Sequence, residues 1–327
     1  MRLPCNRWQP SGGRTRGRAS AGLRLYDSQA MESVLIFANP IAGRGRGKRI
    51  AAELRRRLSG RYDVHAFVQQ ADRVADHELP DDDVRAAIVI GGDGTLRGVT
   101  QRLFDRYGAE RVPPLLVVPL GTANLMRKHL SLNWRDATLA DQVADAIGQR
   151  RVVHLDAARA NGRLFLLMAG VGIDAKVVHE LDRLRSGPID ITSYALPAAL
   201  ALQGYAYSPI EVEIDGARVF GPAPGMVFVG NVPEYGTGFP VLPMARSDDG
   251  VLDVCVLPCR SRADLAHLLL NAISGEHVRG EGVVYTTAKR VRVTSDEDVP
   301  VQVDGEAFGH TPLEIEMIEQ RIPFIVT

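Results

Sequence analysis

The sequence predicts two joined folds: an α/β nucleotide-binding domain with a three-layer parallel sheet, and a second domain of the β-sandwich or barrel-like type. Two observations indicate this division. Residues 31–150 alternate fully apolar runs with segments of helical period, which is typical of strands that helices cover on both faces. Over residues 151–312 the apolar period is two and tight-turn dipeptides separate the segments, which is typical of antiparallel strands.

Strands and helices are expected to alternate in the first domain. Four apolar segments are expected as strands, at 34–38, 64–68, 86–90 and 115–118. Apolar residues between them recur three or four positions apart, as at Ile50, Leu54 and Leu58, and predict intervening helices. Further helices are expected near 123–130 and over 137–147.

Hairpins and short strands are expected in the second domain. Asn161-Gly162 and Asp215-Gly216 separate alternating segments and predict two tight hairpins. LFLLM (164–168) is expected as part of a strand and AGVGIDA (169–175) as a turn. Residues 261–275 are expected as a helix with one apolar face of Leu265, Leu268, Leu269 and Ala272. Residues 313–327 are expected as strands that return to the first domain.

Composition excludes several classes of protein. The 327 residues are 45% hydrophobic and 24% charged, which is ordinary for a globular chain. No apolar run approaches the roughly 18 residues that a membrane span needs, and three cysteines exclude a disulfide scaffold. Residues 1–30 contain six arginines and one acidic residue and are expected to be a disordered basic leader. A transit peptide and an upstream extension before Met31 both remain open, while the acidic remainder argues against nucleic-acid binding.

Three glycine-bearing turns each follow a predicted strand of the first domain. They are ANPIAGRGRGK (38–48), IGGDGT (90–95) and VPLGTAN (118–124). The first is not a Walker A loop, and alone it is as typical of a flexible turn as of a phosphate loop. Because parallel strands end at one edge of a sheet, the three turns are expected to converge and to offer backbone N–H groups to phosphates, at Thr95 among others.

Acidic residues in one of these turns and near the end of the chain are candidate site residues. Asp93 lies among glycines where phosphates would bind, which favours a Mg²⁺ contact through water, with helix capping as the alternative. Asp304 and Glu306 flank Gly305, and this pattern fits both a hairpin turn and a site.

The ordered motifs resemble the diacylglycerol kinase catalytic family, which includes sphingosine kinases and bacterial lipid kinases. NPIAGRGRGK, GGDGT, PLGTAN, AGVGIDA, PMARSDDGVLDV and VQVDGE carry the resemblance over about residues 33–327. It implies that ATP and a lipid meet between the two domains, with transfer of the γ-phosphoryl group to a lipid hydroxyl. It also implies peripheral membrane contact of a cytoplasmic protein.

The resemblance assigns roles to particular residues. Those implied for the nucleotide and its Mg²⁺ are Asn39, Gln69, Gly91, Gly92, Asp93, Gly94, Thr95, Thr122 and Asp156. Glu306 is implied as the general base, helped by Asp304. A second, structural Mg²⁺ site is implied at the Asp249 carboxylate and the carbonyl groups of Arg246 and Val251.

Some positions depart from the family pattern. Arg97 and Gly98 stand where relatives usually have Asn and Glu, and Leu125 and Leu167 replace a common Asp and Asn. A weakened nucleotide or lipid sensor and a soluble-metabolite kinase of the NAD kinase or phosphofructokinase type therefore remain alternatives. The lipid, the nucleotide and the oligomeric state, a homodimer included, stay open.

Overall fold

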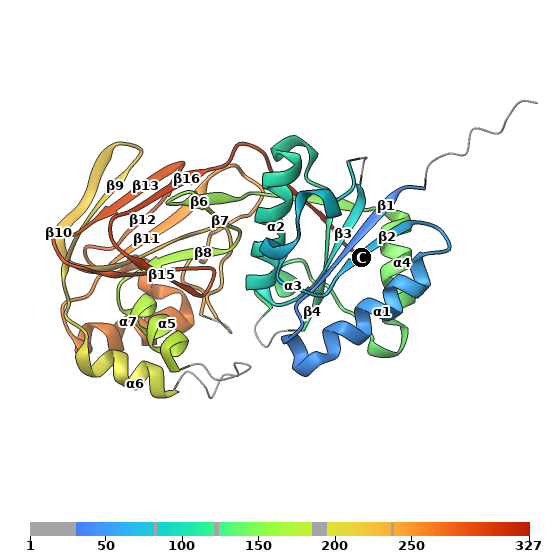
Figure 1. Cartoon of the computed structure of the whole chain (residues 1–327). Coiled ribbons are helices and arrows are strands. Elements are labelled where there is room, and N and C mark those ends of the chain that lie inside the picture. Colours follow the sequence, from blue (N-terminus) through green and yellow to red (C-terminus); the bar gives the residue numbers. More distant parts are fainter. Residues whose placement is uncertain (1–30, 82–83, 121–123, 185–194, 237–238) are drawn as a thin grey trace, which may run out of the picture. The chain divides into compact units, whose positions relative to one another are not determined.

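The computed structural model describes residues 31–81, 84–120, 124–184, 195–236 and 239–327. The predicted basic leader at 1–30 lies outside this part of the chain. Within it, the strands form a six-stranded sheet and an eleven-stranded sheet. A mostly parallel α/β fold and a curled antiparallel sheet confirm the predicted fold class (Figure 1).

The first sheet has the strand order β2-β1-β3-β4-β17-β5. Neighbouring strands pair in parallel except β17 and β5, which are antiparallel. Its strands are β1 (Ser33–Ala38), β2 (Asp63–Phe67), β3 (Val84–Gly91), β4 (Leu115–Pro119), β5 (Val152–Leu155) and β17 (Ile322–Ile325). The order places β1, β3 and β4 side by side, so the ends of these three strands share one edge.

Helices cover both faces of this sheet, because its strands are apolar on both sides. Val34 and Ile36 of β1 pack with the side of the sheet that α1 and α4 cover, and Leu35 and Phe37 pack with the α2 side (Figure 1). The helices are α1 (Arg46–Leu58), α2 (Asp93–Tyr107), α3 (Leu125–His129) and α4 (Leu139–Gln149). Short 3₁₀ helices span Ala42–Gly45, Ala71–Arg73, Asp76–Glu78, Ala109–Arg111 and Asp136–Thr138.

The second sheet runs β15-β14-β8-β10-β9-β13-β16-β6-β7, and β11 joins it through β10 and pairs with β12. Its early strands are β6 (Ala158–Ala160), β7 (Arg163–Phe165), β8 (Met168–Val171), β9 (Pro209–Ile214), β10 (Ala217–Gly230) and β11 (Leu252–Pro258). The later strands are β12 (Val284–Ala288), β13 (Arg290–Thr294), β14 (Pro300–Val303), β15 (Glu306–His310) and β16 (Leu313–Met317). The long strand β10 pairs with β9 at one end and with β8 and β11 at the other, which bends the sheet around a core of valines and isoleucines.

Three helices accompany the second sheet: α5 (Ile173–Leu184), α6 (Ala195–Gly204) and α7 (Arg262–Ser274), with a 3₁₀ helix at Glu276–Arg279. The predicted turn AGVGIDA is instead the end of β8 and the start of α5. Leu265 of α7 is buried as predicted, whereas Leu269 is 48% exposed. In the part of the chain that is described, no helix is both long and apolar enough to cross a bilayer.

The strand predicted at 164–168 is interrupted, and backbone N–H groups at the interruption donate to a side chain. β7 ends at Phe165 and β8 starts at Met168. The N–H groups of Leu166, Leu167 and Met168 donate to the Asp304 carboxylate at 2.9–3.0 Å. A side chain that lies far away in the sequence therefore replaces the strand ladder at this point.

The last segment divides between the two sheets. β16 pairs with β13 and β6 in the second sheet, whereas β17 lies between β4 and β5 in the first. Ile322, Phe324 and Ile325 are fully buried there.

Candidate active site at the start of helix α2

The turns after β1, β3 and β4 meet at one edge of the first sheet. The N–H of Asn39 donates to the carbonyl of Ile90 at 3.2 Å, and the N–H of Leu120 donates to the carbonyl of Gly91 at 2.9 Å. The Asn39 side chain donates from Nδ2 to the Thr95 hydroxyl at 3.3 Å. The structure thus brings Asn39 to the GGDGT segment, while Thr122 lies outside the described residues.

Gly91 allows the close approach of β3 to the first turn of α2. A Cβ atom at position 91 would lie 2.6 Å from Cβ and Oγ1 of Thr95, which is closer than real Cβ atoms approach. Gly92 is the N-cap residue of α2 in an extended conformation, and Asp93, Gly94 and Thr95 form the first turn. Because N–H groups in the first turn of a helix have no partner within it, this turn is suited to bind an anion.

Asp93 joins the GGDGT turn to the next turn of the sheet. Its two carboxylate oxygens accept from the N–H groups of Leu125 and Met126 at 2.9 and 3.1 Å, at the start of α3. Burial raises the pKa of Asp93, and these two bonds oppose that rise. Asp93 therefore caps a helix, as the alternative reading allowed, but the helix is α3 and not its own.

Glu306 of β15 reaches the first turn of α2 from the second sheet. A Cβ atom at position 94 would lie 2.4 Å from Oε1 of Glu306, so only glycine leaves room for this carboxylate. The other oxygen, Oε2, accepts from Nη2 of Arg97 at 2.5 Å and from Nη2 of Arg163. The predicted base and the predicted phosphate turn are therefore in contact.

Asp304 has a different environment from Glu306, although only Gly305 separates them. Asp304 and Gly305 have φ values of 50° and 77° and form the tight turn between β14 and β15. Burial raises the pKa of Asp304 to about 6, while its bonds from Leu166, Leu167 and Met168 act in the opposite direction. In this structure Asp304 fixes the backbone beside Glu306.

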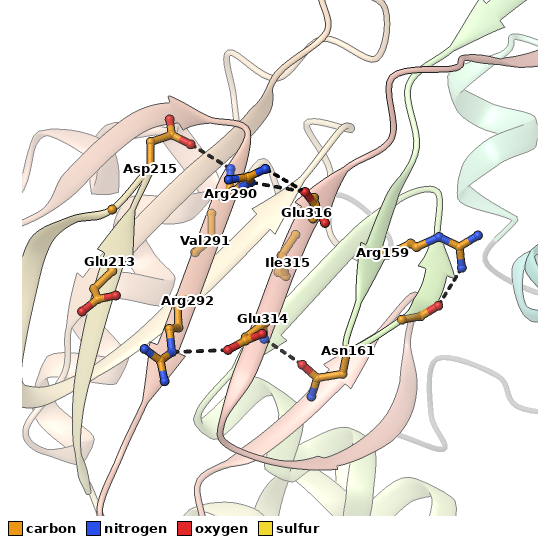
Figure 2. Close-up of a pocket in the computed structure, with 12 residues that line it drawn as sticks. Arg159, Asn161, Glu213, Asp215, Arg290, Val291, Arg292, Glu314, Ile315 and Glu316 are labelled. Atoms are coloured by element: carbon orange, nitrogen blue, oxygen red, sulfur yellow. Dashed lines mark hydrogen bonds and ion pairs between the residues drawn. The ribbon is translucent and has the colours of Figure 1, made fainter. Parts of the chain in front are cut away.

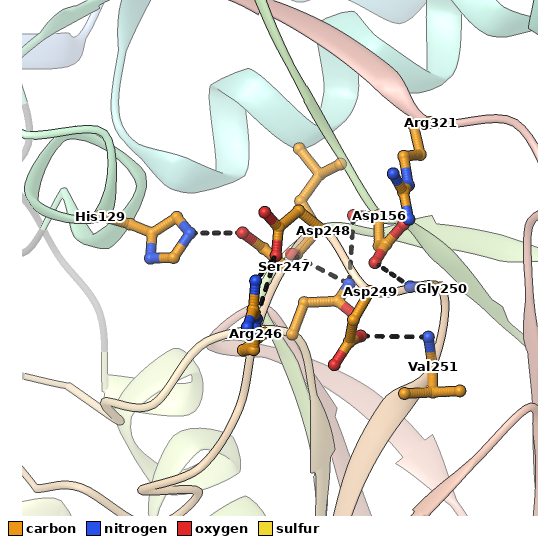
Figure 3. A network of polar contacts seen from close by, with 11 residues as sticks. His129, Asp156, Arg246, Ser247, Asp248, Asp249, Gly250, Val251 and Arg321 are labelled. Carbon is orange, nitrogen blue, oxygen red and sulfur yellow. Dashed lines mark hydrogen bonds and ion pairs between the residues drawn. The ribbon is translucent and has the colours of Figure 1, made fainter.

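Asp156 lies in a second polar network, at the turn of residues 246–251 (Figure 3). Its side chain is 1% exposed, and Oδ1 accepts from Nε of Arg321 at 2.8 Å. Oδ2 accepts from the N–H of Gly250 at 2.7 Å. Nε2 of His129, on α3, lies 2.6 Å from the Ser247 hydroxyl, which links this turn to the helix that Asp93 caps.

The residues predicted to hold metal ions have suitable oxygen ligands. Asp93 is partly buried and makes no ion pair with any described residue, and a carboxylate has about four lone pairs, so its two N–H bonds leave room for a hydrated cation. Asp249 is exposed and accepts from Val251 N–H at 3.3 Å. Burial raises the pKa of Asp253, at the start of β11, and the charge of Asp249 raises it further. Carboxylate and carbonyl oxygens are the ligands that Mg²⁺ prefers.

Two family profiles match the chain in sequence order. The diacylglycerol kinase catalytic domain matches residues 33–160, and the YegS C-terminal NAD kinase beta sandwich-like domain matches residues 168–326. The chain belongs to the diacylglycerol kinase catalytic family.

Named relatives agree with this family over nearly the whole chain. The diacylglycerol kinase of Staphylococcus carnosus (strain TM300) is 27% identical over 292 residues, 88% of this chain and 92% of the relative. That of Bacillus subtilis (strain 168) is 25% identical over 302 residues, 90% and 97% of the two chains. A diacylglycerol kinase crystal structure from Bacillus anthracis str. Sterne shares the fold, with a TM-score of 0.64 at 24% identity, over 92% of this chain and 98% of that one.

Sequence reasoning missed how this member of the diacylglycerol kinase family surrounds Glu306. Arg97 was noticeable as a departure from the family pattern, but 209 positions separate it from Glu306. Arg163 carried no signal, since a lone arginine beside a hairpin is usually solvated. Gln69, two residues past β2, makes no hydrogen bond to the other predicted site residues within the described part of the chain.

A separate cavity lies on the second sheet, away from the predicted family motifs. It has a volume of about 550 Å³ and is lined by residues of β6, β9, β13 and β16 and their turns. Figure 2 shows ion pairs from Arg290 to Glu316 and from Arg292 to Glu314 along it. These exposed pairs connect neighbouring strands, so we assign the cavity no part in the candidate active site.

Proposed function

We propose that the protein is an ATP-dependent lipid kinase that transfers the γ-phosphoryl group to a lipid hydroxyl, as in a diacylglycerol or a sphingoid base. One observation carries the proposal: the Glu306 carboxylate lies against Gly94 in the first turn of α2. Phosphoryl transfer needs a phosphate-binding site beside a group that can accept a proton from the attacking hydroxyl. The names of the relatives support the same class of reaction.

In this proposal the ATP phosphates lie at the start of α2. The first-turn N–H groups bind phosphate oxygens, and Asn39 positions the Thr95 side chain beside them. Bound Mg²⁺ would offset negative charge on the phosphates, held at Asp93 and Thr122, while the turn of Arg246, Asp249 and Val251 would hold a second ion. Asp156 keeps that turn in place through Gly250.

Glu306 is proposed as the general base. Its Oε1 lies against the phosphate turn, while its Oε2 accepts from Arg97 and Arg163 in this structure. An alcohol that enters beside Gly94 would pass its proton to Oε1 as its oxygen attacks the γ-phosphorus of ATP and the bond from that phosphorus to ADP breaks. Such help is worth about 10²- to 10⁴-fold in rate.

A lipid acceptor requires contact with a membrane surface, and exposed apolar side chains support this part of the proposal. On α7, Leu270 and Ile273 are both 69% exposed and one turn apart. The 184–205 segment was the sequence-based candidate for the acyl path, and within it Leu196 of α6 is 60% exposed. Residues 185–194 of that segment lie outside the described part of the chain.

The proposal is tested by incubating the protein with labelled ATP, Mg²⁺ and a panel of lipids, and identifying the labelled product. We expect a phosphorylated lipid, and a turnover about 10²- to 10⁴-fold lower in Glu306→Gln with little loss of ATP binding. Near-normal turnover of that variant would remove Glu306 from the role. ATP binding without a labelled lipid would favour a sensor.

A soluble-metabolite kinase is the second candidate, because the profile that matches the second domain is named for its likeness to NAD kinase. The two candidates differ in their need for an interface. Activity that requires detergent or lipid vesicles supports the lipid kinase, whereas full activity on a water-soluble alcohol without them supports the alternative.

A further inference from the structure

Two arginines, one on α2 and one on β7, donate hydrogen bonds to one oxygen of Glu306. Arg97 belongs to α2, one turn past Gly94, and Arg163 opens β7. Both donate from Nη2 to Oε2 of Glu306. The Arg163 guanidinium also lies 5.3 Å from the centroid of the Phe308 ring. Glu306 and Phe308 share one face of β15 because they are two residues apart, so this face fixes the position of Arg163.

The two guanidinium groups have more donors than Glu306 can use. Each guanidinium has five N–H donors. Within the residues that the structure covers, Glu306 is the only carboxylate that either group pairs with. The nearby Asp304 already accepts from three backbone N–H groups, so it uses few of the guanidinium donors.

Arg97 shows the surplus directly. Its side chain is 11% exposed, and its Nε is buried without a hydrogen-bond partner. A buried donor without an acceptor is costly, and in native proteins a bound ion or an ordered water commonly satisfies such a group. Since the group is cationic and borders the first turn of α2, the acceptor that fits it is an anion.

We propose that Arg97 and Arg163 form a binding site for a phosphate-type oxyanion, and that Glu306 occupies their donors while the site is free. This inference rests on the proposed function, because it places the anion beside the phosphate turn at Gly94. An arriving phosphate group exchanges places with the Glu306 carboxylate at the guanidinium groups. The arginines then neutralise the phosphate, and Glu306 is released to accept the hydroxyl proton.

The exchange predicts opposite effects for the two kinds of substitution. Removing either arginine removes charge-assisted hydrogen bonds and should weaken phosphate binding about tenfold or more. Removing the competing charge in Glu306→Gln should strengthen binding about threefold or more. A purely structural role of the ion pairs would weaken binding in all three variants.

The experiment measures the affinity of inorganic tripolyphosphate by calorimetry for the full-length protein, Arg97→Gln, Arg163→Gln and Glu306→Gln. Arg159→Gln is the matched control. Arg159 lies on β6, stacks 5.0 Å from the Phe104 ring of α2 and donates to the Gly162 carbonyl, but it pairs with no described carboxylate. Its variant should bind as wild type does. Arg97→Lys and the more exposed Arg163→Gln keep the test valid if Arg97→Gln does not fold.

The measurement does not depend on lipid phosphorylation, so the two proposals can fail separately. Wild-type affinity in both arginine variants, or no binding of tripolyphosphate by the wild type, would overturn the inference. An absent lipid product with the expected pattern of affinities would overturn the lipid kinase alone.

Further arms identify the source of the phosphate. The arginine variants are compared with wild type in ATP and ADP affinity and in turnover on two lipids. If they lose affinity for ATP but not for ADP, and lose turnover equally on diacylglycerol and phosphatidylglycerol, the site binds the γ-phosphoryl group. A loss restricted to phosphatidylglycerol assigns it to an acceptor head group.

Discussion

Replacing Gly94 by alanine tests the contact on which the proposed mechanism rests. The new methyl group would lie 2.4 Å from Oε1 of Glu306, whereas ordinary contacts begin at 3.4 Å. The carboxylate must therefore move by about 1 Å, and a displacement of that size costs about 10²-fold in rate when geometry is critical. The protein itself should tolerate the change, because the displaced atom is the end of a flexible side chain. Alanine also favours helix by about 1 kcal/mol over glycine.

Gly98 provides the control for this variant. It lies one turn further along α2, and a Cβ atom added there would meet no atom within 4 Å. We expect Gly98→Ala to retain wild-type turnover and Gly94→Ala to lose about 10²-fold, with both free energies of unfolding within about 1 kcal/mol of wild type. Turnover is measured with labelled ATP and lipid vesicles, and stability by urea denaturation.

The double variant separates displacement of Glu306 from a direct clash with the nucleotide. If the methyl group acts through Glu306, Gly94→Ala should add little further loss in a Glu306→Gln background. Wild-type turnover of Gly94→Ala would refute the reasoning. The reasoning would also be refuted if Gly94→Ala lowered turnover by about 10²-fold in the Glu306→Gln background as well.

Three further predictions concern other parts of the molecule. Burial raises the pKa of Asp174 to about 7, so the folded state binds this proton more tightly than the unfolded state. Stability should therefore fall as the pH rises from about 4 to 7, and Asp174→Asn should exceed wild type at pH 8 by up to about 4 kcal/mol in urea denaturation; parallel pH profiles would contradict this. Arg321→Gln leaves the buried Asp156 without its cation. Because Arg321 is 40% exposed, we expect a modest loss of about 1–3 kcal/mol in the same assay, and unchanged stability would show that the pair contributes nothing. Leu270→Ser with Ile273→Ser should lower co-sedimentation with lipid vesicles about tenfold or more, since both apolar side chains are lost; equal binding would exclude α7 from membrane contact.

Local periodicity predicted most of the first domain. Ile50, Leu54 and Leu58 are buried on one face of α1, as their spacing indicated. The convergence of Asn39 and the GGDGT turn followed from the parallel sheet, because parallel strands end at one edge. These features depend on residues near one another in the sequence or on a general property of the fold.

Features that depend on distant residues were not visible in the sequence. The break between β7 and β8 depends on the Asp304 carboxylate, which binds amides more than 130 positions away. The grip on Glu306 depends on an arginine from each domain. Leu269 matched the apolar face of α7, yet it is half exposed because no described element covers it. Spacing alone cannot tell whether an apolar residue at the margin of a helix face meets a neighbour.

The position of β17 has a consequence for how the protein is made. Residues 322–325 form β17, which lies between β4 and β5. When the ribosome has synthesised the chain only as far as β5, the strand that joins β4 to β5 is therefore still missing. The edges of β4 and β5 then have unpaired backbone groups throughout synthesis of the second domain, and such edges can pair with other chains. A fragment of residues 31–155, which ends with β5, should therefore aggregate.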